Sequence, residues 1–345
     1  MSRTPAISLL TPVWNGLPYI KETVASVLSQ EFQDWELVIA DNCSTDGTSE
    51  YLKSLTDPRI KVYRHEKNLG IYRNIHFLFN HASAPIFAGL CADDYLLNPK
   101  SLGELVDEWA RVGADVGMIS FNWKSRQTKH NALAAYAVDV LPNRMSGWQS
   151  SVAFFLFGCF PGNFSEVSGR VSVMAPEHYL YHVKYSADYE YYMRLVKRTG
   201  IYLSNKDVVY IRRHDGVAAT RMITKGEYHE ESFAVYEKII DDLTPFCDRS
   251  LLINFYNIEL CSYHLRDAIR SALRGKFTAL KSFMSLKSPI FWPTGFQTIG
   301  LLPFALSERL RFAVTTRLAG AIIKQSNARI TQSKAEETLP QLDVA

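Results

Sequence analysis

The sequence predicts an α/β fold with a mostly parallel central sheet flanked by helices, followed by a helical C-terminal region. Three observations support this prediction. Short apolar stretches alternate with helical patterns over residues 1–120, polar residues follow consecutive apolar stretches, and the pattern beyond residue 225 is wholly helical. Strands separated by helices form βαβ units, whose strands pair in parallel.

Five apolar stretches predict the strands of this sheet. They cover residues 7–10, 37–40, 60–63, 85–90 and 116–121. Apolar residues at helical spacing predict the intervening helices, over residues 17–30, 48–55, 71–79 and 99–110. The first third of the chain therefore reads as successive βαβ units.

The pattern is less regular between residues 121 and 187. Aromatic residues and glycines are frequent there, as in loops that shape a pocket. The aromatic stretch 148–164 fits either the binding of a sugar or lipid, whose surfaces suit aromatic rings, or packing in the core. A helix over 188–199 and short strands up to residue 212 follow. We expect one domain over residues 1–220 and a helical region over 221–345.

The composition excludes several classes of protein. The chain has 345 residues, 47% apolar and 21% charged, which is typical of a globular protein and not of a disordered chain, a collagen or a disulfide scaffold. Its net charge of +3 is too small to indicate nucleic acid. Five scattered cysteines without a CxxC spacing indicate reduced thiols in the cytosol. We find no signal peptide and no stretch typical of a membrane span.

Polar side chains follow the predicted strands where those strands end. In an open α/β sheet, ligands bind outside the carboxyl ends of the strands. The candidates at these ends are Thr11, Asn15, Asp41, Asp46, Asp93 and Asp94. Each alone also fits a helix cap or a turn.

The pair Asp93-Asp94 follows the predicted strand 85–90. Two adjacent carboxylates repel each other unless a cation or a hydrogen-bond donor offsets their charge. A hard divalent cation with oxygen ligands is a natural partner, and it would also bridge phosphates. The alternative is that both residues form a turn before Pro99.

Several motifs occur in a recognisable order. The segments TPVWNG, VIADNCSTDGT, RHEKNLGIYRN and GLCADDYLLNP resemble an inverting family 2 glycosyltransferase. Downstream, SADYEYYMRLVKRTGIYLSNKDVVYIRRH resembles the helix of the catalytic aspartate and the closing Arg/His segment of that family. The resemblance covers about residues 5–215. It implies a GT-A type fold and a nucleotide-diphospho-sugar donor.

The resemblance also implies roles in donor binding. Residues at the ends of the first two strands would hold the base and ribose: Thr11, Pro12, Asn15 and Asp41. Arg73 would approach the diphosphate, or it is a solvated helix residue. A later cluster would close over the diphosphate: Arg212 or Arg213, with His214. His214 also fits an ordinary loop histidine.

For the metal and the chemistry, the resemblance implies that Asp93 and Asp94 hold Mg²⁺ or Mn²⁺, with His214 as a further ligand. Family members often carry an acidic residue two positions before the first aspartate, where this chain has Cys91. A thiol adds little affinity for a hard cation. Asp188 would be the catalytic base, and its alternative role is a helix N-cap.

Asp188 and Glu190 would lie about 200° apart around a helix, so they do not form a paired-carboxylate site. The resemblance favours Asp188 as the residue that faces the cleft. Glu190 and Arg194 have i,i+4 spacing and are expected to form a surface ion pair.

The C-terminal region is strongly basic. Residues 266–324 contain ten Lys and Arg residues against Asp267 and Glu308. Within 305–324 an apolar stripe is expected, with Arg311 and Arg317 off it. The stripe consists of Leu310, Val314, Leu318 and Ile322. This pattern indicates an interfacial segment on an anionic membrane surface, or a core-packed helix with a solvated basic face.

The sequence therefore predicts a glycosyltransferase that moves a sugar, from UDP by default, to a hydroxyl of a glycan or lipid-linked acceptor. We expect it at the cytoplasmic face of the plasma membrane. One alternative is a non-catalytic nucleotide-sugar scaffold or sensor. Another is a sugar-nucleotide pyrophosphorylase, which would need a glycine-rich phosphate loop, whereas TPVWNGLPYI holds a single glycine.

Overall fold

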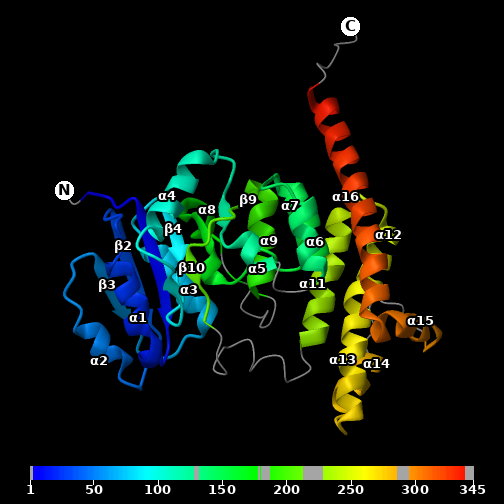
Figure 1. Ribbon diagram of the computed structural model, residues 1–345, viewed down its shortest axis with the longest axis horizontal. Helices are drawn as coiled ribbons and strands as arrows, with labels where there is room; N and C mark the ends of the chain where they lie inside the picture. Colours follow the sequence, from blue (N-terminus) through cyan, green and yellow to red (C-terminus); the bar gives the residue numbers. More distant parts are fainter. Residues whose placement is uncertain are drawn as a thin grey trace. The chain divides into compact units, whose positions relative to one another are not determined.

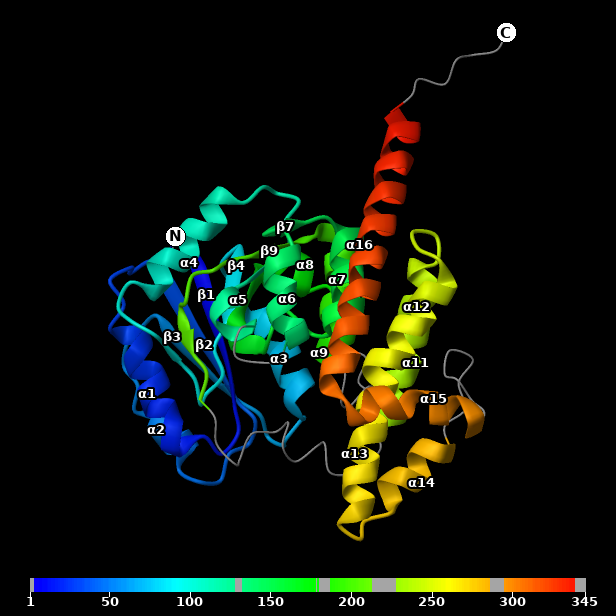
Figure 2. The same cartoon turned by 45° about the vertical axis from the view of Figure 1, so that its right-hand side comes forward.

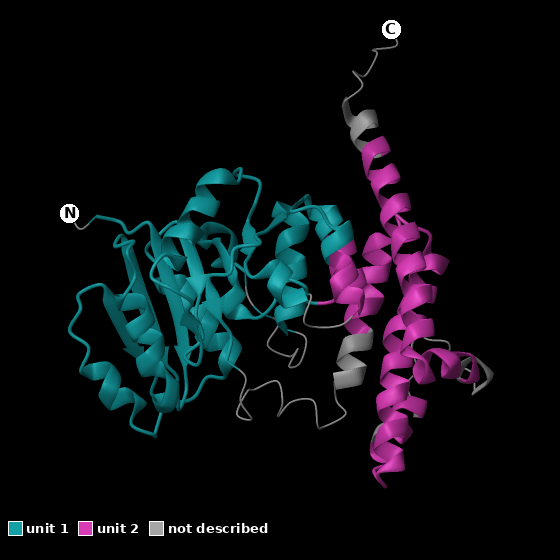
Figure 3. Ribbon diagram, in the orientation of Figure 1, with its two compact units in different colours: residues 1–131, 138–150, 159–215 teal, residues 132–137, 151–158, 216–345 magenta. Residues whose placement is uncertain are grey.

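The structure is a computed structural model. It describes residues 3–127, 132–177, 179, 187–212, 228–285 and 295–338. The chain divides into two compact units (Figure 3). Unit 1 holds residues 1–131, 138–150 and 159–215, and unit 2 holds residues 132–137, 151–158 and 216–345. Two short segments of the predicted first domain therefore belong to unit 2.

The centre of unit 1 is a mixed, mostly parallel sheet (Figure 1). Within the described residues it has eight strands in the order β3-β2-β1-β4-β8-β6-β9-β7. Their bounds are β1 Ile7–Val13, β2 Trp35–Asp41, β3 Ile60–Arg64, β4 Ile86–Gly89, β6 Met118–Ser120, β7 Arg144–Met145, β8 Val167–Arg170 and β9 Ile201–Leu203. The five predicted strands are all present, and the predicted fold class is confirmed.

The parallel part of the sheet consists of β3, β2, β1 and β4, while β8 runs antiparallel to both β4 and β6. A separate two-stranded ladder joins β5 to β10. Their bounds are β5 Tyr95–Leu96 and β10 Val209–Tyr210. Strand β5 follows one segment of the site described below, and β10 precedes another.

Helices cover both faces of the parallel strands. The helices that lie wholly or partly in unit 1 are α1 Leu17–Leu28, α2 Thr48–Lys53, α3 Ile71–His81, α4 Ser101–Arg111, α5 Trp123–Gln127, α6 Ala132–Val140, α7 Gly147–Phe157, η1 Phe164–Glu166, α8 Val171–Met174 and α9 Ala187–Thr199. Side chains of α1 and α4 pack in one core with alternate residues of β1 and β2. Phe79 of α3 packs on Phe87 of β4, outside that core. Coverage on both faces explains why β2 is buried along its whole length.

The interpretation of residues 121–187 as pocket-forming loops was wrong. This stretch contains α5, α6, α7 and the sheet strand β8. Phe154, Phe155 and Phe160 are almost fully buried, and Phe155 packs against Phe255 in the core of unit 2. These rings therefore follow the packing alternative, because a fully buried ring offers no face to an acceptor.

Unit 2 is helical throughout its described residues, as predicted (Figure 2). Its helices are α11 Tyr228–Leu243, α12 Arg249–Tyr256, the π-helical turn η3 Asn257–Cys261, α13 Ser262–Leu273, α14 Thr278–Ser285, α15 Gly295–Leu306 and α16 Glu308–Thr338. None of the helices in the described part of the chain is long and apolar enough to cross a membrane.

The apolar stripe expected over residues 305–324 differs from the face that α16 buries. The buried face is Arg311, Thr315, Ala319, Ile322, Ser326 and Ile330. Leu310 is 42% exposed. Arg311 is buried because Glu259 and Glu308 lie 3.7 and 3.8 Å from its guanidinium and offset its charge. Arg311 is therefore not part of a solvated basic face.

We predict that Gly89→Ala destabilises unit 1, because a Cβ on Gly89 would lie 2.1 Å from the carbonyl oxygen of Phe164. Such overpacking costs about 1–3 kcal/mol. Gly103→Ala is the matched control, since its Cβ would meet only Phe32 at 3.9 Å in the first turn of α4, and the change should stabilise by at most about 1 kcal/mol. Urea unfolding measures both, and equal stabilities of the two variants would contradict this packing.

Candidate functional site

The strand order reverses between β1 and β4, which marks the position in an open α/β sheet where ligands bind. From β1 the chain adds β2 and β3 on one side, whereas β4 pairs with the other side of β1. Such a reversal opens the sheet at the carboxyl ends of its strands, where α/β proteins bind ligands. The segments that leave β1, β2 and β4 at this edge contain the predicted polar residues.

Hydrogen bonds fasten the loop after β1 to the loop after β2. The backbone N–H of Asn15 donates to Ser44 Oγ at 2.8 Å, and Asn15 Oδ1 accepts from the N–H of Thr45 at 2.9 Å. The N–H of Gly16 donates to Thr48 Oγ1 at 3.0 Å. Asn15 has φ of +50°, a left-handed conformation that asparagine tolerates better than most residues. The predicted residue Asn15 thus helps to fix the two loops together.

Asp41, the last residue of β2, is fully buried and organises the loop that follows it. Its carboxylate accepts from the N–H of Ser44 at 3.0 Å and from the hydroxyl of Ser49, and Arg64 Nε lies 3.4 Å away. A carboxylate has about four lone-pair sites, so these three neighbours leave little acceptor capacity.

Thr11 lies on β1, fully buried, and Pro12 beside it is half-buried. Among the described residues, Thr11 Oγ1 has no hydrogen-bond partner. A buried hydroxyl without a partner is uncommon in folded proteins. Thr11 is thus a polar group at the sheet edge whose hydrogen-bonding capacity is unused.

The loop before α3 joins the same edge. Asn42 Nδ2 donates to Asn68 Oδ1 at 2.9 Å, and Asn42 Oδ1 accepts from the N–H of Leu69 at 2.8 Å. Arg73 is exposed in the first turn of α3, directly after this loop. The structure therefore brings the beginning of α3, with Arg73, beside the loop that follows Asp41.

The acidic segment after β4 gathers three possible ligands. One ligand atom each of Cys91, Asp93 and Asp94 lies within 4.8 Å of the others. Asp94 is 3% exposed, and its carboxylate accepts from Ser165 Oγ at 2.6 Å and from the N–H of Arg212 at 2.9 Å. Thr23 holds the segment in place, since its hydroxyl lies 2.8 and 2.7 Å from the carbonyl oxygens of Ala92 and Asp94.

Burial raises the pKa of Asp94 to about 6, with a smaller contribution from the neighbouring Asp93 carboxylate. The same burial raises the pKa of the Cys91 thiol, so its sulfur stays protonated. A protonated thiol is a poor ligand, whereas carboxylate oxygens suit a hard divalent cation. Asp93 and Asp94 are therefore the residues here that fit a metal, and Cys91 is not.

Arg212 closes the acidic segment from another part of the chain. Besides its N–H contact to Asp94, its Nε donates to the carbonyl oxygen of Asp93 at 3.0 Å, and its Nη2 contacts Glu22. The guanidinium carbon lies 5.0 Å from the ring centre of Tyr19. Arg213 and His214, the other predicted members of this cluster, lie outside the described residues.

Asp188 is the second residue of α9 and is half-buried. Burial raises its pKa, while donation from the N–H of Tyr189 at 2.8 Å opposes the rise. Burial, and after it the nearby Asp188 carboxylate, raises the pKa of the buried Tyr192. Asp188 thus lies in a buried environment within unit 1, one helical turn before this tyrosine.

The expected pair of Glu190 and Arg194 is present, with Nε and Oε1 2.9 Å apart. It is not a surface pair, because Glu190 is only 4% exposed. The guanidinium of Arg194 offsets the charge of the buried Glu190 carboxylate, and it also contacts Glu177.

The sequence interpretation missed several residues of this edge. Ser165, which contacts Asp94, and Glu22, which contacts Arg212, are distant in sequence from these partners, and nothing in their neighbourhoods signals the contacts. Trp14 lies inside the TPVWNG motif and is 52% exposed directly after β1. A large exposed aromatic residue beside a sheet edge is the kind of signal that could have identified it.

Comparisons with known proteins agree with this architecture. Residues 8–167 match the model of glycosyl transferase family 2. The putative teichuronic acid biosynthesis glycosyltransferase TuaG of Bacillus subtilis is 39% identical over 92 residues, which is 26% of this chain and 36% of TuaG. The UDP-Glc:alpha-D-GlcNAc-diphosphoundecaprenol beta-1,3-glucosyltransferase WfgD of Escherichia coli is 31% identical over 88 residues, 26% of this chain and 35% of WfgD. The chain thus spans about a third of each relative.

Two solved structures share the fold over nearly the whole chain. S. aureus TarS 1–349 in complex with UDP-GlcNAc has a TM-score of 0.54 at 15% identity, covering 98% of this chain and 94% of TarS 1–349. The mannosyltransferase PcManGT from Pyrobaculum calidifontis, in complex with GDP-Man and Mn²⁺, has a TM-score of 0.53 at 16% identity, covering 95% and 88%. The resemblance to family 2 glycosyltransferases and the GT-A type fold are confirmed.

We predict a pH-dependent stability that Asp94→Asn removes. In the folded chain the pKa of Asp94 is about 6, above the value of about 3.9 for an unfolded chain. Between these values the folded state binds more protons, so stability falls as pH rises. In urea unfolding with EDTA, Asp94→Asn should gain stability over wild type between pH 4 and pH 7, by about 2–3 kcal/mol.

Asp107→Asn is the control for this measurement, because Asp107 is exposed on α4. It removes one exposed carboxylate and so controls for the loss of a charge. A stability difference from wild type that stays constant between pH 4 and pH 7 for Asp94→Asn would contradict the raised pKa of Asp94.

Proposed function

We propose, on the premise that residues 8–167 match glycosyl transferase family 2, that this chain is an inverting glycosyltransferase. It moves a sugar from a nucleoside diphosphate sugar to a hydroxyl group in the biosynthesis of a polysaccharide or related glycan, and residues 1–220 carry this activity. The observation that carries the proposal is the acidic segment after β4, whose two carboxylates lie close together where the strand order of the sheet reverses.

The donor binds across the loops that leave β1, β2 and β3. Thr11 offers a buried hydroxyl without a partner among the described residues, and Asp41 keeps limited acceptor capacity toward a ring N–H of the base. The diphosphate is bound by Arg73, Arg213 and His214. Because TarS has been solved with UDP-GlcNAc, we propose a UDP-sugar as donor.

The acidic segment holds Mg²⁺ or Mn²⁺ through Asp93 and Asp94, with His214 as a further ligand. When bound, such a cation neutralises the diphosphate that leaves the sugar. The protein contributes a fixed position for the two carboxylates, since Ser165, Arg212 and Thr23 hold the segment in place. PcManGT has been solved with Mn²⁺, which supports this assignment.

Asp188 is the general base. Inversion requires a hydroxyl to lose its proton on one face of the sugar while the diphosphate leaves from the other. A carboxylate within hydrogen-bond reach of the hydroxyl accepts this proton, and a raised pKa makes it a stronger base at neutral pH. Burial raises the pKa of Asp188 in this direction. Glu190 is committed to Arg194 and takes no part.

The acceptor is a glycan or a lipid-linked glycan, and the enzyme works at the cytoplasmic face of the plasma membrane. The name of WfgD specifies a diphosphoundecaprenol-linked acceptor, which supports a lipid-linked substrate. The ten cationic residues of 266–324 favour contact with an anionic membrane surface.

We predict that Asp188→Asn lowers transfer about a hundredfold or more, the usual effect of losing a general base, and leaves the Kd for the donor unchanged. Product formation measures the first quantity and calorimetry with the UDP-sugar measures the second. Asp107→Asn, which removes an exposed carboxylate on α4, is the control and should keep transfer within severalfold. Loss of donor binding in Asp188→Asn would show that the assigned role is wrong.

A thermal-shift screen of UDP- and GDP-sugars with Mn²⁺ tests donor and metal together. At a hundredfold excess over Kd, a ligand stabilises by about 2.7 kcal/mol, which corresponds to a rise in Tm of about 4 °C for a chain of this length. We predict this rise for a UDP-sugar with Mn²⁺, its reduction in Asp93→Asn, and its retention in Asp107→Asn. Binding without any turnover or donor hydrolysis would instead identify a non-catalytic sensor.

A further inference from the structure

We propose that the turn between α13 and α14, residues 273–277, inserts into the interface of an anionic membrane and docks the chain there. This inference rests on the membrane association within the proposed function and identifies the element responsible for it. The predicted stripe on α16 does not fit this role, because α16 buries a different face within unit 2.

The turn presents two large apolar side chains to solvent. Leu273 is 82% exposed and Phe277 is 57% exposed. Gly275, with φ of +78°, ends α13, and the N–H groups of Gly275 and Lys276 donate to the carbonyls of Ala272 and Ser271, both at 2.9 Å. The turn is therefore well defined, and it lies at the end of the α13–α14 pair (Figure 2).

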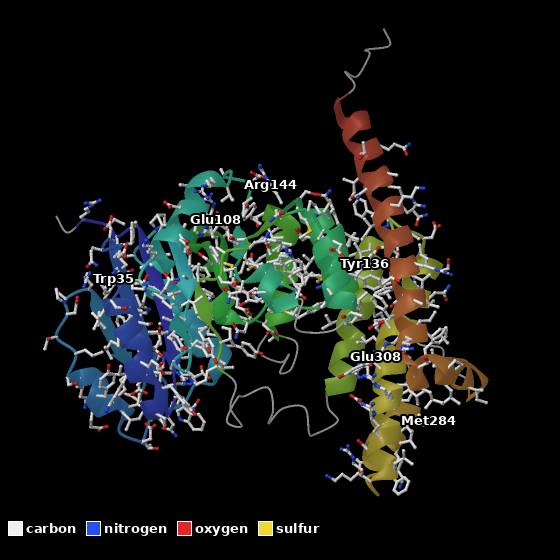
Figure 4. The ribbon with its side chains drawn as sticks, viewed as in Figure 1. Trp35, Glu108, Tyr136, Arg144, Met284 and Glu308 are labelled. Atoms are coloured by element: carbon white, nitrogen blue, oxygen red, sulfur yellow. The ribbon has the colours of Figure 1, made fainter. Side chains whose placement is uncertain are left out.

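The outer face of α14 continues this surface. Phe277, Lys281 and Met284 are spaced i, i+4 and i+7, so they share one side of the helix. Met284 is 56% exposed (Figure 4), whereas Phe283, about 100° further around the helix, is fully buried. Helix α14 thus buries Phe283 and leaves Phe277 and Met284 exposed to solvent.

The charges around the turn identify the occupant as an anionic lipid surface. Residues 268–307 contain no Asp or Glu. The cationic side chains of this stretch that the structure describes are exposed: Arg270, Arg274, Lys276 and Lys281. Apolar residues that penetrate the headgroup region, ringed by cations that meet lipid phosphates, are typical of interfacial binding. A second copy of this chain would bring the same cations face to face, which disfavours self-association.

Sedimentation of the full-length protein with vesicles tests the proposal. The vesicles are pure phosphatidylcholine, or phosphatidylcholine with phosphatidylglycerol. The turn variants are Leu273→Ser/Phe277→Ser and Lys276→Glu/Lys281→Glu. The controls are Leu28→Ser/Val62→Ser and Lys53→Glu/Lys100→Glu, which make the same kinds of change at exposed apolar and lysine residues in unit 1. Circular dichroism checks that each variant keeps its helices.

We expect wild type to bind the anionic vesicles only, and less at high salt. Each turn variant should lose about tenfold or more in partition coefficient, and each control should stay within about twofold. The proposal is overturned if the turn variants bind like wild type, if wild type does not bind, or if Leu273→Ser/Phe277→Ser abolishes self-association in sedimentation velocity without changing vesicle binding. Donor turnover is assayed in the same samples: its absence from all of them, with vesicle binding as expected, would refute the transferase activity and not the docking turn.

Discussion

Two carboxylates on consecutive residues at the end of a buried strand form the constraint on which the site depends. Asp93 and Asp94 repel each other, and burial disfavours the charge of Asp94, so its pKa rises to about 6. The chain supplies donors to Asp94 from Ser165 and Arg212. These contacts fix the geometry without cancelling the charge, which leaves the segment suited to an external cation.

The residues that hold the acidic segment come from distant parts of unit 1, and the antiparallel pairings bring them together. The antiparallel strand β8 lies between β4 and β6, and Ser165 stands just before it, where its hydroxyl reaches both Cys91 N–H and Asp94. The ladder of β5 with β10 delivers Arg212 to the same place. A purely parallel arrangement of the first 120 residues would lack both contacts.

The βαβ part of the fold could be predicted because each strand and helix has a local pattern of its own. The strand ends Asn15, Asp41 and Asp93 were found for the same reason. Ser165 was not, because its contacts depend on the long-range pairing of β8 with β4 and β6. The buried face of α16 was not predicted because it includes a charged residue, Arg311. The charge of Arg311 is offset by Glu259, which lies 52 residues away in sequence, and the periodicity of a helix does not reveal such a partner.

The most direct measurement is a crystal structure of the protein with a UDP-sugar and Mn²⁺, with anomalous diffraction to locate the manganese. The account predicts that the anomalous peak places manganese within bonding distance of a carboxylate oxygen of Asp93 or Asp94 and of the diphosphate. It also predicts that the Asp188 carboxylate faces the anomeric carbon. Manganese bound elsewhere with the acidic segment unliganded, or a sugar oriented away from Asp188, would contradict it.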